Sequence, residues 1–269
     1  SLEERTGLGK TGEVFIVGSD KLMRSDMYHD MKNRTIEASL AGNVVEKNGV
    51  DSDATRDALA GRTGIKPIID YRGQLTLAAY SPIDFDGIRW AIVAKMDMDE
   101  AVSPVDENGQ EFLAQYKDAY GYEDLMLFMN DGFMFYSIAK EADYRTNLVN
   151  GKYRTTNLGG LIQNIVRTRQ SGFADYALYA PSGNKAQSFI AAPLIIDGKV
   201  EIIVALQLNN ERINALMAER YGLGKTGEAY LVGPDKLMRS DSYLNPTTHS
   251  VQASLTNPLK GSADTESVR

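Results

Sequence analysis

An internal duplication sets the modular plan of this chain. Residues 5–26 and 220–241 align without a gap and differ at five of 22 positions, and the same offset of 215 relates IEASL at 36–40 to VQASL at 251–255. Because a repeat determines the modular plan before any local pattern is considered, the sequence predicts three parts. They are a first module at 1–105, a central module at 106–219 and a partial copy of the first module at 220–269.

The repeated segment contains GLGKTGE, at residues 7–13 and 222–228, which invites comparison with a phosphate-binding P-loop. That loop consists of a glycine, four further residues and then Gly-Lys-Ser/Thr, with a strand before it and a helix after it. Glu4 and Glu219 stand at the first glycine position, and strand-like segments follow the motif. The motif therefore predicts a tight turn into a strand, and we expect no binding of ATP or GTP.

The first copy predicts an α+β module. Its expected elements are a strand at 13–17, a helix at 52–61 and strands at 73–80 and 88–94, with a hairpin turn at 84–87 that carries Asp-Gly. The second copy repeats the first strand at 228–232 but stops where the helix should begin. We expect it to be incomplete, and partly mobile unless it packs on its neighbour.

The central module is predicted to have a similar succession of helices and strands. Its helices are expected at 106–120, 158–168 and 210–219, and its strands at 124–129, 133–136, 173–179, 188–196 and 199–208. Turns with Asp-Gly at 131–132 and 197–198 join two strand pairs. Without long crossovers the strands must be antiparallel, so each module is predicted to be a curved antiparallel sheet flanked by helices, joined to the next by longer helices.

Composition excludes several classes of protein. A net charge of -7 and a pI near 5.0 argue against nucleic-acid partners, and the absence of cysteine excludes disulfides and thiolate chemistry. Apolar runs such as 200–206 fall short of the roughly 20 residues of a spanning helix. The chain has no initiator methionine and no signal peptide, so it is expected to be a segment of a larger protein that meets a membrane only through other segments.

Few residues suggest catalysis or metal binding. The two histidines, His29 and His249, are interpreted as surface loop residues, because no spacing indicates a catalytic triad or a zinc site. Arg24 and Arg239, each ringed by aspartates, are interpreted as structural ion pairs, with carboxylate binding as the alternative. We predict no catalytic residue, no metal and no cofactor.

Two segments of the central module combine aromatic and charged side chains. A strand end and the long loop after it bring together Tyr136, Lys140, Asp143 and Tyr144, the kind of position where ligand sites concentrate. Strand 173–179 alternates, which predicts one face shared by its odd-numbered residues. The predicted ligand-binding residues are Tyr136, Lys140, Asp143, Tyr144, Phe173, Asp175 and Tyr179.

On this interpretation Asp175, flanked by Phe173 and Tyr179, holds the ammonium group of an amine or amino acid through its charge, with cation–π support. The alternative is a solvated strand face with tyrosines in the core. Both readings are compatible with the pattern of residues.

The repeated letters GLGKTGExxxVGxDKLMRSD, at 7–26 and 222–241, resemble the membrane-proximal half of double-Cache sensor regions in bacterial methyl-accepting chemotaxis proteins. The central module resembles the membrane-distal half of the same regions, through YGYEDL, KEAD, TNL and YAPS at 120–125, 140–143, 146–148 and 179–182. The order of parts differs from the usual single distal-then-proximal arrangement.

The resemblance implies PAS-like extracytoplasmic (periplasmic) modules of an inner-membrane chemotaxis transducer. Such modules bind a small molecule, such as an amino acid, an amine or an organic acid, and relay its presence through helices to a cytoplasmic output. The resemblance also allows a homodimer of the full-length receptor. Alternatives are the sensor region of a histidine kinase or cyclase and, from another class, a structural spacer or adhesion repeat without a ligand.

Overall fold

The structure is a computed structural model that describes residues 7–219 and 221–265. It divides into two compact units, Ser1–Pro104 and Val105–Arg269. The first unit contains the first module. The second unit contains the central module together with the partial copy, so these two share one unit although the duplication relates the partial copy to the first module.

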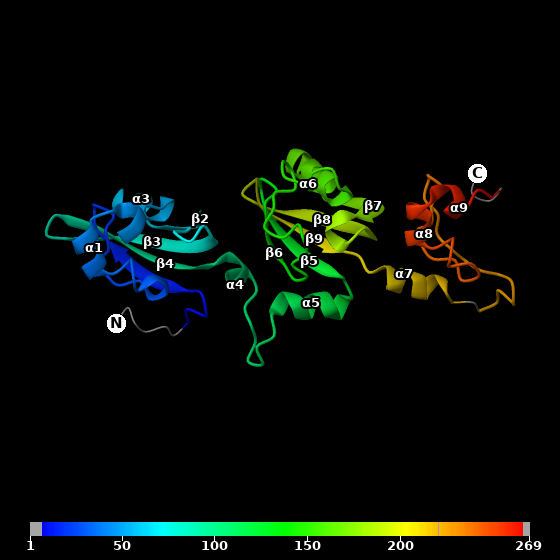
Figure 1. Ribbon diagram of the computed structural model, residues 1–269, viewed down its shortest axis with the longest axis horizontal. Coiled ribbons are helices and arrows are strands. Elements are labelled where there is room, and N and C mark those ends of the chain that lie inside the picture. The colour runs from blue at the N-terminus through cyan, green and yellow to red at the C-terminus, as the bar shows by residue number, and fades with distance from the viewer. Residues whose placement is uncertain (1–6, 220, 266–269) are drawn as a thin grey trace. The chain divides into compact units, whose positions relative to one another are not determined.

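The first module is a four-stranded antiparallel sheet of order β1-β4-β3-β2 with helix α3 against one face (Figure 1). Its strands are β1 (Glu13–Val17), β2 (Gly64–Ile69), β3 (Leu75–Phe85) and β4 (Ile88–Asp97). Its helices are the 3-10 turn η1 (Tyr28–Asp30), α1 (Ile36–Gly42), α2 (Val45–Asn48), α3 (Asp53–Leu59) and α4 (Met98–Val102).

Local sequence explains the elements that were predicted here. Helix α3 begins after Ser52, which forms a capping box with Thr55. Asp86 and Gly87 join β3 to β4 with φ values of 47° and 79°, the left-handed geometry that an Asp-Gly hairpin turn requires. The predicted strand 13–17, helix and hairpin are confirmed, whereas β2 and α1 were not predicted and β3 extends further than expected.

The first GLGKTGE segment forms the expected turn. The amides of Lys10 and Thr11 donate hydrogen bonds of 2.7 and 2.8 Å to the two carboxylate oxygens of Glu100. Backbone amides that a P-loop would offer to phosphate are thus bonded to a carboxylate of the same module, and β1 follows the turn. The sequence also predicts that a helix ends just before Gly7, and that helix end lies outside the described residues.

The central module is a five-stranded antiparallel sheet of order β6-β5-β9-β8-β7 with helix α6 packed on it (Figure 1). Its strands are β5 (Asp124–Met129), β6 (Met134–Ser137), β7 (Gly172–Tyr179), β8 (Lys185–Ile196) and β9 (Lys199–Gln207). Its helices are α5 (Phe112–Tyr120), α6 (Asn157–Thr168), the 3-10 turn η2 (Ala180–Ser182) and α7 (Asn210–Met217).

The apolar face of α6 builds the core of this module. Leu158, Ile162 and Ile165 pack with Phe128 and Phe189 of the sheet. The antiparallel α+β class is confirmed. Two details differ from expectation: α5 begins later, because residues 106–110 form a turn around the Asp106 carboxylate, and the connecting helices α4 and α7 have only five and eight residues.

The partial copy contains two short helices, α8 (Val251–Thr256) and α9 (Pro258–Gly261). The strand predicted at 228–232 is wrong, because this segment forms only an isolated bridge from Val232 to Met238. In the first module β1 pairs with β4, and the described part of the copy, residues 221–265, supplies no such partner. Helix α8 packs against β7 and β8 of the central module, as expected for an incomplete copy that rests on its neighbour.

Among the described residues, no helix has both the length and the apolar character needed to cross a membrane.

Candidate functional site

Asp143 and Tyr179 meet inside the central module. The Tyr179 hydroxyl donates a hydrogen bond to Asp143 Oδ2, and both side chains are almost completely buried. Asp143 lies in the long loop after β6, and Tyr179 ends β7. Burial raises the pKa of Asp143 despite the bond from Tyr179, and the charge of Asp124 adds to the rise. The carboxyl therefore holds its proton more tightly than an exposed aspartate does.

Asp124 is a second buried carboxyl close to this pair. It is the first residue of β5, and its Oδ2 accepts a 2.7 Å hydrogen bond from Ser137 Oγ. Its Oδ1 accepts bonds of 2.8 to 3.0 Å from the amides of Leu125, Ile138 and Ala139. Burial raises the pKa of Asp124 even though these bonds oppose the rise.

Glu141 is the third carboxyl of the group. Its Oε2 accepts a hydrogen bond from the hydroxyl of Ser182, the last residue of η2, which follows Tyr179 in the chain. Burial raises the pKa of Glu141, and the charges of Asp143 and Asp124 raise it further. We call Asp124, Glu141 and Asp143, with the Tyr179 hydroxyl, the acidic cluster.

The acidic cluster contains no basic side chain. Among residues 7–219 and 221–265, no lysine or arginine forms an ion pair with any of its three carboxyls. Buried carboxylates without a cation are unfavourable, and the raised pKa values are the consequence. A cation that entered this cluster would gain attraction and would relieve repulsion among the carboxylates.

The first module has a buried carboxyl at the corresponding place in its sheet. Glu13, the first residue of β1, lies opposite Lys95 of β4, and Asp124, the first residue of β5, lies opposite Gln207 of β9. Strands β4 and β9 correspond, because each is the last strand of its module and leads into a connecting helix. Where the first module has a lysine, the central module has an uncharged amide.

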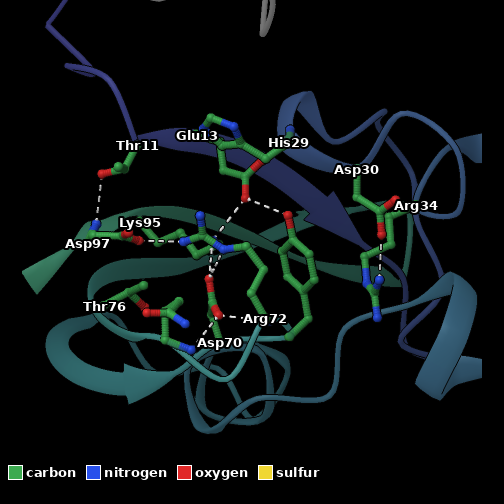
Figure 2. Close-up of polar contacts among 12 residues, drawn as sticks. Thr11, Glu13, His29, Asp30, Arg34, Asp70, Arg72, Thr76, Lys95 and Asp97 are labelled. Atoms are coloured by element: carbon green, nitrogen blue, oxygen red, sulfur yellow. Dashed lines mark hydrogen bonds and ion pairs between the residues drawn. The ribbon is translucent and has the colours of Figure 1, made fainter. Parts of the chain in front are cut away.

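Figure 2 shows the polar contacts around this lysine, Lys95. Lys95 Nζ lies 2.9 Å from Glu13 Oε1 and 2.7 Å from Asp70 Oδ2, and all three side chains are buried. The Arg72 guanidinium donates to Asp70 Oδ2 at 2.7 Å, and the Tyr71 hydroxyl donates to Glu13 Oε1 at 3.2 Å. Although burial opposes it, bonds and charges from Lys95 and Arg72 hold the pKa of Asp70 below its usual value. This network supplies its own cations.

A polar groove of about 440 Å³ adjoins the acidic cluster. Ser137 lines the groove and also donates its hydroxyl to Asp124. The other lining residues are Gln110, Glu111, Ala114, Gln115, Asp118, Ile138 and Lys140. The volume falls within the range of small-molecule sites, roughly 300–1,000 Å³.

The structure brings together most of the loop residues that the sequence singled out. Tyr136 is buried and its hydroxyl donates to Glu111 Oε2 at 2.9 Å, so it reaches a residue of the groove. Lys140 lines the groove, with its ammonium 5.7 Å from the centre of the Tyr144 ring. Tyr144 packs against the core.

Phe173 and Asp175 lie elsewhere. Strand β7 bulges between Ala174 and Ala177, which breaks the alternation, so Tyr179 reaches the core whereas Phe173 and Asp175 are exposed. The prediction that these three share one face is wrong for this reason. Asp175 accepts hydrogen bonds of 2.7 and 2.9 Å from Arg239 Nε, so its charge is already paired. Among the predicted acids Asp143, and not Asp175, lies in the acidic cluster.

Sequence reasoning missed Asp124, Glu141 and Ser182. The signal for Asp124 was available, because it is a lone carboxylate in the apolar strand DLMLFM. Glu141 and Ser182 approach each other only through the fold, 41 residues apart in the chain. No spacing in the sequence indicates that contact.

The two repeated arginines form the structural ion pairs that were predicted. Arg24 pairs with Asp20 at 2.8 Å and Arg239 with Asp235 at 2.9 Å. His29 lies exposed in η1 and His249 is partly exposed in a loop. In the part of the chain that the structure describes, no three His, Asp or Glu side chains are arranged to hold a metal ion.

No protein-family model and no curated protein matches the chain. Among solved structures it is similar to the ligand-binding domain of the Pseudomonas fluorescens chemoreceptor CtaA in complex with L-serine, at 12% identity and TM-score 0.44 over 78% of each chain. It is also similar to the ligand-binding domain of the Pseudomonas aeruginosa amino acid chemoreceptor PctB in complex with L-Arg, at 12% identity and TM-score 0.42 over 80% of this chain and 78% of that one.

A third similar structure is an extracellular ligand binding receptor from Desulfohalobium retbaense, at 10% identity and TM-score 0.39. The match covers 73% of this chain but only 30% of that receptor. Extracellular domains of histidine kinases are similar as well.

Proposed function

We propose that this chain is a sensor region that binds a small cationic molecule, an amine or an amino acid, in its central module. The observation that carries the proposal is the acidic cluster, two buried carboxyls and the half-buried Glu141 without a cation, at the place where the first module uses Lys95. A ligand ammonium would complete the central module as Lys95 completes the first. We propose no catalytic role.

Binding of an ammonium group is linked to proton release. Burial raises the pKa values of Asp143 and Glu141, so these carboxyls bind protons more tightly than exposed carboxyls do. A bound cation favours the ionised carboxylates and lowers these pKa values again. Affinity should therefore rise with pH through the raised pKa values, and binding should release protons to the buffer.

The acidic cluster is well placed to influence the helix that leaves the module. Gln207, opposite Asp124, donates a 3.0 Å hydrogen bond to Glu123, and α7 begins three residues later at Asn210. Suppose that the ligand binds more tightly when β9 is in one of two positions. Ligand binding would then shift the population of β9, and of the helix α7 that follows it, toward that position. In an extracytoplasmic region of a chemotaxis transducer, such a shift would be the signal.

The sensor region of a histidine kinase or cyclase would use the same acidic cluster and the same helix. That alternative differs from a chemotaxis transducer only in the cytoplasmic output, which is not part of this chain. A spacer or adhesion repeat would need no ligand. The acidic cluster favours a sensor over a spacer, because a purely structural core gains nothing from two buried carboxyls and a half-buried third that lack a cation.

Calorimetric titration with a panel of monoamines, diamines, amino acids and dicarboxylates tests the proposal. We expect a cationic member to bind, with affinity that rises between acidic and neutral pH. The Asp143→Asn variant should lose about tenfold or more in affinity, because a charge-assisted hydrogen bond contributes about 1.5–3 kcal/mol. Asp197→Asn, in an exposed turn, is the matched control and should bind normally.

Two results would overturn the proposal. One is that no amine or amino acid binds while a dicarboxylate does. The other is that the cationic ligand binds Asp143→Asn and Glu141→Gln as tightly as the wild-type chain.

A further inference from the structure

The partial copy is attached to the central module at one edge of its sheet, formed by the β7 bulge and the β7–β8 turn. Arg239 Nε donates to both oxygens of Asp175, at 2.7 and 2.9 Å. Gln252 Oε1 accepts from the Ala186 amide at 2.6 Å, and Gln252 Nε2 donates to the Asn184 carbonyl at 3.1 Å. We call Asp175, Asn184 and Ala186 the docking edge.

The first module contains a second version of the surface that holds this edge. Arg24 corresponds to Arg239, and each arginine donates to an aspartate four residues before it and to the two preceding carbonyls. The helix that follows is also repeated, with Ile36 at the position of Val251. The duplication therefore preserves the geometry of the docking surface as well as its letters.

The two versions differ in exposure. Val251 is 0% exposed, whereas Ile36 is 41% exposed. The Arg239 side chain is 13% exposed, against 26% for Arg24. Within residues 7–219 and 221–265, the Arg24 Nε donates no hydrogen bond, while its counterpart binds Asp175. One copy of the surface is thus covered, and the other is open.

We propose that the open surface of the first module, formed by Arg24, Ile36, Glu37 and Leu40, is a docking surface for the docking edge of a second copy of this chain. Each chain covers its own edge with its partial copy, so docking requires release of that copy. The first module of one chain then replaces the partial copy of the next. Such a contact joins different surfaces of two identical chains, so it links copies head to tail.

One substitution between the repeats makes the first module the weaker partner. Glu37 stands where Gln252 donates to the Asn184 carbonyl. A carboxylate can still accept from the Ala186 amide, but it cannot donate to a carbonyl. The covered state within one chain is therefore favoured, and the exchange needs a trigger that frees the edge.

The variant Arg239→Glu supplies that trigger, because a carboxylate facing Asp175 and Asp235 expels the partial copy from the edge. Sedimentation of this variant over a wide range of concentrations should show reversible self-association, as head-to-tail docking requires. The double variant Arg24→Glu with Arg239→Glu exposes the same edge but should remain monomeric. Adding Glu37→Gln to Arg239→Glu should tighten association by about two- to tenfold, the effect of one hydrogen bond.

Two outcomes would overturn the proposal. A folded Arg239→Glu variant that stays monomeric at every concentration shows that the open surface does not bind the edge. Equal association of the single and double variants shows that contacts are unspecific and do not use Arg24. Circular dichroism of each variant checks that its secondary structure is retained.

Discussion

The two modules differ in how they compensate a buried carboxyl at the start of the first strand of the sheet, Glu13 in one and Asp124 in the other. In the first module, Lys95 bridges Glu13 and Asp70 at 2.9 and 2.7 Å, and the pKa of Asp70 is held below its usual value. In the central module, the residue opposite this carboxyl is Gln207, and the pKa values of Asp124 and Asp143 are raised.

We interpret this difference as one between a structural role in the first module and the proposed binding role in the central module. A buried ion network with internal cations is complete, and removing a member leaves an uncompensated charge. A carboxyl cluster without a cation lowers the stability of the folded state, and such unfavourable clusters are common at ligand-binding sites. Substitutions that exchange the two arrangements test this interpretation.

The largest effect is expected for Lys95→Met. Loss of the ammonium leaves Glu13 and Asp70 buried beside each other, and breaking a buried pair in this way costs about 3–5 kcal/mol. Trp90, the one tryptophan of the chain, lies in β4, so the fluorescence of Trp90 during urea unfolding reports on the first module. We expect a much lower midpoint of unfolding for this variant.

Lys66→Met is the matched control. Lys66 pairs with Asp57 near the surface, with its side chain 32% exposed, so its loss should cost no more than about 1 kcal/mol. The pH dependence gives a second readout. The pKa of Asp70 is lowered in the folded state, so this stabilisation is present above the usual aspartate pKa and is lost as pH falls through the lowered value. Lys95→Met should weaken that dependence, and equal midpoints for the two lysine variants would contradict the comparison.

The repeat shows how much of the fold was predictable from sequence. Residues 228–232 keep the first and last letters of β1 and have other apolar residues at the three positions between. The hydrogen bond to the following loop is also kept, because the Leu231 amide donates to Ser240 Oγ as the Ile16 amide donates to Ser25 Oγ, each at 2.8 Å. Yet only the first copy forms a strand, because β4 pairs with it. Local letters predict turns, caps and hairpins, whereas a strand depends on a partner elsewhere in the chain.

The candidate site was predictable to a similar extent. The loop after β6 was recognised from its mixture of charged and aromatic side chains, and this identified Asp143. Asp175 was assigned to the same face as Tyr179 because the alternation of the strand was assumed to be regular. A bulge adds one residue to β7 and shifts the alternation, and the residue pattern does not reveal it. The contact of Asp175 with Arg239 joins residues 64 apart, and such a pairing follows from packing alone.

The second prediction concerns a substitution that gives the central module the lysine that the first module has. Gln207→Lys places an ammonium opposite Asp124, as Lys95 lies opposite Glu13. At neutral pH we expect stabilisation of the central module by about 1.5–3 kcal/mol, the scale of a hydrogen bond to a charged group, together with loss of amine binding. Scanning calorimetry and titration measure the two effects.

Gln207→Met, similar in length but uncharged, separates charge from packing. It should not stabilise the central module, and it should retain amine binding. If the lysine variant still bound the amine as tightly as the wild-type chain, the acidic cluster would not be the cation site.

The smallest effect is expected for Asp143→Asn in the absence of ligand. The asparagine can still accept the Tyr179 hydrogen bond, and the penalty of a buried carboxylate disappears, so the central module should gain about 1 kcal/mol at neutral pH. The sign of the pH dependence follows from the raised pKa of Asp143, because wild-type stability is highest below the unfolded pKa and falls as pH rises through the folded value. The advantage of the variant should therefore vanish in acid and grow toward neutral pH, with Asp197→Asn showing no such trend. Calorimetric midpoints across that range measure it, and a variant that is destabilised equally at every pH would show that Asp143 is a structural acceptor for Tyr179 and not part of a cation site.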